Sequence, residues 1–164
     1  MATNETQELK FQLLDSSNRN RELYILAGSS SISPAMRAEL SKSRDTRIRL
    51  RIAESEQTSQ FLLLELSRDS ESEVRLAVAD NPSTSDYVLK RLAADEDLDV
   101  RYGMASNPHL SPNILLSLTG DINPYVCDRA KRTIARNRVA TATLPAVLRI
   151  PTSSRDEQKQ VAMP

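Results

Sequence analysis

The sequence is poor in the residue types from which catalytic and metal sites are most often built. Its 164 residues include no tryptophan, a single cysteine and a single histidine. Cys127 alone cannot form an internal disulfide, and Cys127 with His109 cannot complete a closed zinc site. No base or partner cysteine that would activate the thiol is evident beside Cys127. We therefore expect no enzyme activity, no metal and no cofactor.

A net charge and long apolar runs are also missing. Basic and acidic side chains number 22 each, and a net charge of zero argues against a protein that binds polyanions in general. No run approaches the roughly 20 apolar residues of a membrane span, and the opening MATNETQELKFQ lacks the regions of a signal peptide. With 39% hydrophobic residues, the composition predicts a soluble globular protein in the cytoplasm, without a membrane partner.

A repeat of 26 residues runs through most of the chain, since DSESEVRLAVADNP from Asp69 recurs as DEDLDVRYGMASNP from Asp95. At that offset several residue types align in columns. The columns are Asp69, Asp95 and Asp121; Arg49, Arg75 and Arg101; Ala27, Ala53, Ala79 and Ala105; and Ser33, Ser59, Ser85 and Ser111.

The predicted domain, 1–138, holds units 17–42, 43–68, 69–94, 95–120 and 121–138, after a capping helix at about 5–14. The remaining 139–164 is expected to be a tail, partly docked or disordered.

Each unit is predicted to be a pair of short helices, A and B. Helix A in the third unit carries Val74, Ala77 and Val78 at helical spacing and must stop before Pro82. Helix B follows a serine that can cap it. One pair cannot bury its own apolar stripe, so the units must stack. The sequence predicts an all-α solenoid of about five two-helix repeats.

The pattern of Asp, Val-Arg, Ala, Asn-Pro and a leucine-rich helix resembles the leucine-rich repeat variant family of bacterial α-solenoids, relatives of the HEAT and armadillo repeats. The resemblance covers about 45–137 and is most specific in the two central units. It implies a curved, right-handed superhelix that serves as a binding surface without catalysis of its own. Some members carry an iron–sulfur cluster on several cysteines, which a chain with only Cys127 cannot hold.

Helix B positions outside the core stripe form two rows across the units. If helix B lines the concave side, as in related solenoids, the rows would make an apolar groove with a polar rim for another protein. The alternative is that these side chains merely pack between successive B helices. The predicted partner-binding residues are Phe61, Leu64, Tyr87, Lys90, Asn113 and Leu116.

Basic clusters at both ends of the array suggest a second function, nucleic-acid binding, because arginines there could contact phosphates. Acidic central units and a lack of nearby stacking aromatics weigh against it. The regular Asp and Arg columns are instead expected to form a structural ladder between units. The possible phosphate-contacting residues are Arg44, Arg47, Arg51, Arg129, Arg132 and Arg136.

Overall fold

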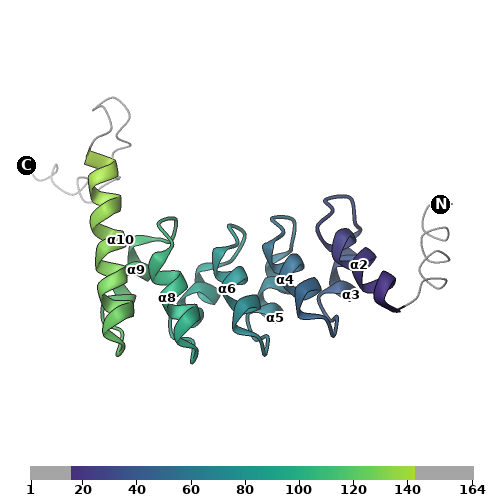
Figure 1. Cartoon of the computed structure of the whole chain (residues 1–164). Coiled ribbons are helices and arrows are strands. Elements are labelled where there is room, and N and C mark those ends of the chain that lie inside the picture. Colours follow the sequence, from purple (N-terminus) through teal and green to yellow (C-terminus); the bar gives the residue numbers. More distant parts are fainter. Residues whose placement is uncertain (1–15, 143–164) are drawn as a thin grey trace, which may run out of the picture.

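The computed structural model describes residues 16–142, and within this range every regular element is an α-helix. The helices follow one another along an elongated array with α2 at one end and α10 at the other (Figure 1). The A helices are α2 (Ser16–Ala27), α4 (Thr46–Glu54), α6 (Ser72–Asp80), α8 (Leu98–Ser106) and α10 (Pro124–Ala142). The B helices are α3 (Pro34–Leu40), α5 (Gln60–Leu66), α7 (Asp86–Leu92) and α9 (Pro112–Leu118). The all-α, repeated architecture is confirmed; its handedness and the number of repeats stay predictions.

The ends of the A helices follow from local chemistry. α6 ends at Asp80, and Asn81 is its extended C-cap, because the ring of Pro82 excludes the helical conformation from the residue before it. α8 ends in the same way before Asn107 and Pro108. The Asn-Pro pairs therefore make the predicted turns.

The serine column caps the B helices only in part. Ser33 accepts a hydrogen bond from the N–H of Met36, and Ser59 accepts one from the N–H of Leu62. Ser85 and Ser111 occupy the same N-cap position but make no such side-chain bond. The prediction of four serine caps is thus right for the first two and wrong for the other two.

The core is a single strip between the two helix layers. The four units with two described helices contribute apolar side chains from both, α10 adds Val126 and Ala130, and the alanine column from Ala27 to Ala105 is buried throughout, which lets neighbouring helices approach closely. The largest fully buried side chains are Ile48, Ile52, Leu63, Leu92, Met104, Ile114, Leu115, Leu118, Val74, Val78, Val88 and Val100. Stability therefore comes from interfaces that no unit can form alone.

Packing between units runs mainly through the A helices. α2 packs on α4, α4 on α6, α6 on α8 and α8 on α10, whereas neighbouring B helices contact one another far less. The A helices are therefore the more closely packed layer, and the B helices are the more widely spaced one. That helix B lines a concave face stays a prediction.

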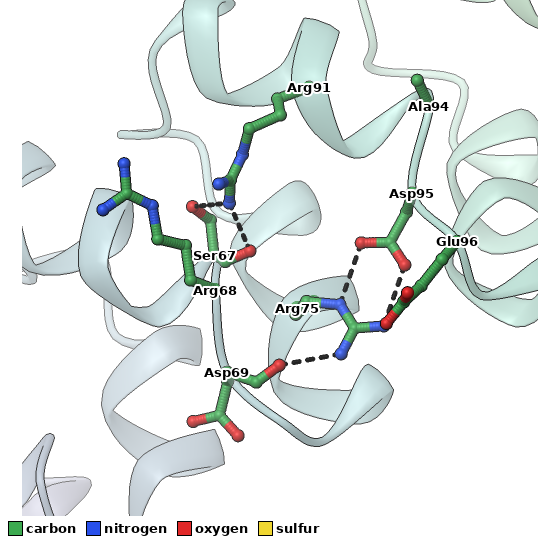
Figure 2. A pocket seen from close by; sticks show the side chains of 8 residues that line it. All are labelled: Ser67, Arg68, Asp69, Arg75, Arg91, Ala94, Asp95 and Glu96. Atoms are coloured by element: carbon green, nitrogen blue, oxygen red, sulfur yellow. Dashed lines mark hydrogen bonds and ion pairs between the residues drawn. The ribbon is translucent and has the colours of Figure 1, made fainter.

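A largely buried arginine side chain joins each central unit to the next. The Nη2 and Nε atoms of Arg75 each lie 2.8 Å from a carboxylate oxygen of Asp95, and Nη1 donates to the carbonyl of Asp69 at 2.8 Å (Figure 2). Arg49 binds Asp69, and Arg101 binds Asp121, through the same atoms. The ladder predicted from the Asp and Arg columns is present.

The contact between the first and second units, which we call the first junction, lacks both members of the arginine–aspartate pair that forms each rung of the ladder. Leu23 stands in the arginine column of the first unit, and Ser43 stands in the aspartate column of the second. The hydroxyl of Ser43 still accepts from the N–H of Asp45, as the carboxylates of Asp69, Asp95 and Asp121 each accept from the N–H two residues further on. Where the arginine is absent, its aspartate is absent too, so no buried carboxylate is left without its cation.

The ladder shifts the acidity of its carboxyls. Burial alone raises the pKa of Asp69 and Asp95, but hydrogen bonds from arginine and from a backbone N–H, with the arginine charge, outweigh it and hold each pKa below its ordinary value. The same balance lowers the pKa of Asp121. The folded state thus stabilises the ionised carboxylates.

Two predicted segments fall largely outside the described residues, the capping helix at about 5–14 and the tail 139–164. α10 runs through Ala142 and so passes the boundary at 138 drawn from the repeat pattern. In the described part of the chain, no helix is long and apolar enough to cross a membrane.

Arg75→Ala should lower the free energy of unfolding by about 3 kcal/mol, because it leaves the carboxylate of Asp95 buried without its cation. Arg47→Ala is the matched control, since the Arg47–Asp45 pair has an arginine side chain that is 75% exposed. It should cost at most about 1 kcal/mol. Urea unfolding of both variants compares them, and equal losses would show that the ladder is no stronger than a surface pair.

Stability should also fall in acid. A carboxyl whose folded pKa lies below its unfolded value of about 3.9 stabilises the protein above that pH, and the contribution is lost as pH falls through the folded pKa. The free energy of unfolding should therefore decline below about pH 4. The decline should be shallower in Arg75→Ala, where Asp95 has lost the arginine. Identical acid profiles would contradict the assignment of this loss to the ladder.

Candidate binding surface

Three large apolar side chains project from successive B helices. Phe61 on α5 is 69% exposed, Tyr87 on α7 is 66% exposed, and Leu116 on α9 is 53% exposed. In each of these helices the other apolar side chains face the core, for example Leu62 and Leu63 beside Phe61. The three therefore protrude into solvent and do not pack between B helices. We call Phe61, Tyr87 and Leu116 the B-layer row.

The other predicted partner-binding residues divide into two kinds. Lys90 and Asn113 are exposed on α7 and α9 and flank the B-layer row as polar neighbours. Leu64 is half-buried and packs against the core. Its side chain therefore contributes to stability as well as to the surface. The positions of the residues in the repeat did not reveal this partial burial.

The first basic cluster is largely engaged with its own neighbours. Arg47 is paired with Asp45 at 2.8 Å, and Arg51 is paired with Glu54 at 3.2 Å. Arg44 is exposed next to them, in the turn before α4. Arg44 and Arg47 lie at the N-terminal end of α4 and Arg51 lies in its last turn, so these arginines bring no continuous row of unpaired cations to the surface.

The second basic cluster lies on α10. Arg129 donates to the hydroxyl of Ser106 at 2.8 Å, Arg132 pairs with Asp128 at 2.9 Å, and Arg136 is exposed. α6 and α8 stand between this helix and α4 in the chain of packed A helices. The structure thus keeps the two basic clusters apart and does not join them into one groove.

A hollow on the A layer was missed by sequence reasoning. It lies between α4 and α6, has a volume of about 420 Å³, and has both apolar and acidic walls. Its lining residues are Leu50, Glu54, Glu56, Glu73, Leu76, Ala77, Asp80, Asn81 and Pro82. The signal in the sequence was Ala77, which stands where the second and last units have Arg51 and Arg129.

A smaller hollow, about 280 Å³, lies beside the ladder (Figure 2). The carboxylate of Asp95 in its wall points at Arg75, and the guanidinium of Arg91 donates to the hydroxyl of Ser67 at 2.7 Å. Most of its polar groups are thus already bound to one another. This surface is a consequence of the ladder.

The single histidine lies in a turn, and the single cysteine lies in α10. His109 is exposed in the turn before α9, and its backbone N–H donates to the side chain of Asn107 at 2.8 Å. The thiol of Cys127 is partly buried and lies 2.9 Å from the carbonyl of Thr119. Among residues 16–142, no three His, Cys, Asp or Glu side chains come together in a way that could hold a metal ion.

A stack of two-helix units with one continuous core and a recurrent inter-unit contact defines a helical repeat protein. Comparison with family models agrees: residues 73–97 match the leucine rich repeat variant family, a span that covers α6 and α7. This part of the array is therefore similar to that family of helical repeats. No curated protein matches the chain, and no solved structure matches it either.

Truncating the B-layer row should leave the fold nearly unchanged. Phe61→Ala and Tyr87→Ala should each cost less than about 1 kcal/mol, as expected for exposed side chains. Leu63→Ala and Leu92→Ala, at fully buried positions of α5 and α7, should each cost about 2–5 kcal/mol. Urea midpoints of the four variants make the comparison. Losses of equal size would mean that the row belongs to the core.

Proposed function

We propose that this protein is a non-catalytic scaffold or adaptor that binds another protein along the B-layer row. The observation that carries the proposal is the exposure of Phe61, Tyr87 and Leu116 on three successive units. Exposed apolar side chains scattered singly are ordinary, but Phe61 and Tyr87 stand one period apart and Leu116 lies one helical turn past their column on the next B helix, and such a continued row marks a binding surface.

The architecture suits such a role. Each B helix has seven residues and is anchored by its core side chains, so the B-layer row is held by rigid elements. An aromatic ring with few rotatable bonds loses little entropy on binding, and tyrosine is enriched among residues that dominate interface energies. Lys90 and Asn113 would supply polar contacts at the rim. A partner with apolar side chains spaced to match the units would bury all three row residues.

The setting that fits this function is the cytoplasm, and by family resemblance a bacterial one. Nucleic-acid binding remains the alternative that the arginines suggest. The separation of Arg51 on α4 from Arg129 on α10 by two intervening A helices does not favour it. The partner assay below includes that alternative as an outcome.

The proposal predicts which variant loses the partner. Wild-type protein, Phe61→Ala/Tyr87→Ala and the control Tyr125→Ala should be immobilised and exposed to nuclease-treated native lysate, with bound proteins quantified by mass spectrometry. Tyr125 is 75% exposed but lies on α10, outside the row. A genuine partner should be retained by wild type and control and reduced at least tenfold by the double variant.

A recombinant form of that partner should then bind directly, with the same ranking by calorimetry. The proposal is wrong if no protein shows this ranking. Retention of nucleic acid that disappears as salt rises, without a protein partner, would instead support the arginine clusters.

A further inference from the structure

The A layer contains a second repeated contact, made between a residue and the one 27 positions earlier. At the first junction the guanidinium of Arg51 lies over the ring of Tyr24, 5.8 Å from its centre. At the last junction Arg129 lies over Tyr102 at 5.9 Å. In both places the chain itself supplies an arginine to the space between two A helices.

At the two central junctions, α4 with α6 and α6 with α8, a small residue takes the repeat position that Arg51 and Arg129 have at the outer junctions. Gly103 occupies the position in α8, and Leu76 fills the space, since a Cβ on Gly103 would lie 2.5 Å from a methyl carbon of Leu76. Ala77 occupies the position in α6 and leaves open the hollow of about 420 Å³ described above. The junction between α4 and α6 is therefore one that lacks the chain's own arginine and remains open.

The walls of this hollow carry excess negative charge. Glu54, Glu56, Glu73 and Asp80 line it, and among the described residues only Glu54 has a cationic partner, Arg51. Asp80 accepts a hydrogen bond from Asn107 at 2.7 Å, but burial still raises its pKa. A carboxyl in that condition gains from the arrival of a positive charge.

The shape of the hollow selects the kind of cation. Its carboxylates do not converge as a metal site would, because no three acidic side chains within 16–142 are placed to hold an ion. Leu50, Leu76 and Ala77 form an apolar lining, which suits the methylene stem of a long basic side chain. A guanidinium can then reach carboxylates on two walls through its several N–H groups.

We propose that the hollow between α4 and α6 binds an arginine side chain presented by a basic segment of a partner protein. The incoming guanidinium takes the place that Arg51 and Arg129 occupy at the first and last junctions. The site lies on the A layer and stands independently of the B-layer row, so it would remain if the row had no partner.

Supplying the missing arginine in the chain tests the site without any partner. Ala77→Arg should have a higher urea midpoint than Ala77→Gln, an uncharged control of similar helix propensity, at low ionic strength. The difference should shrink as sodium chloride is added. A midpoint for Ala77→Gln equal to or above that of Ala77→Arg would overturn the preference for a cation.

Binding is tested on the whole chain by nuclear magnetic resonance with N-acetyl-arginine amide as the probe and N-acetyl-citrulline amide, its uncharged counterpart, as the control. The arginine probe should shift the amides of Leu50, Ala77 and Asn81 saturably, and the citrulline probe should not. Ala77→Arg and the double variant Glu73→Gln/Asp80→Asn should both lose the saturable response. Phe61→Ala/Tyr87→Ala should keep it, which separates this site from the B-layer row.

Three results would overturn the proposal: no saturable shift, equal shifts with both probes, or arginine shifts that persist in Ala77→Arg. Self-association of the wild type that Ala77→Arg abolishes, measured by sedimentation, would identify the occupant as a second copy of this chain. That outcome would equally exclude a separate basic partner.

Discussion

The buried arginine–aspartate rung is the contact on which the stacking of this protein depends. Arg75 binds a carbonyl of its own unit and the carboxylate of Asp95 in the next unit, so a single guanidinium fixes the position of both. A slip in the stacking would leave Asp95 buried without a cation, at a cost of several kcal/mol. The first junction has Leu23 and Ser43 in these positions, so neither half of the rung is left there without its partner.

A fixed register is also what creates the two surfaces. Because every unit is placed alike on its neighbour, Phe61 and Tyr87 recur at the same position of successive B helices, and Leu116 is exposed one helical turn past that position on the next one. The same regularity brings Ala77 to the position that Arg51 and Arg129 occupy at other junctions. One scaffold therefore presents an apolar row on one layer and an acidic hollow on the other.

Sequence reasoning found the row but missed the hollow, for a geometric reason. The B-layer row can be found within single short helices, because its residues are the apolar ones that remain once core positions such as Leu63 are assigned. The alignment at 26 shows Ala77 in the column of Arg51 and Arg129, but the hollow depends on which side chains meet across a junction, at an offset of 27, and that the column does not display. The partial burial of Leu64 and the lack of side-chain cap bonds at the serines before α7 and α9 escape sequence reasoning for a related reason, since burial and side-chain hydrogen bonds depend on neighbouring units and on exact torsion angles.

The sequence by itself determined the period, the two-helix unit and the ladder, because apolar spacing, Asn-Pro breaks and matched Asp and Arg columns are local or strictly periodic signals. Residues 73–97 carry enough of them to match the leucine rich repeat variant family. Only the tertiary structure decided which helix layer is packed more tightly and which side chains stay exposed. It also decided where a small residue such as Ala77 leaves space. Those properties arise from contacts between units, where the size of one side chain and the position of another across the junction act together.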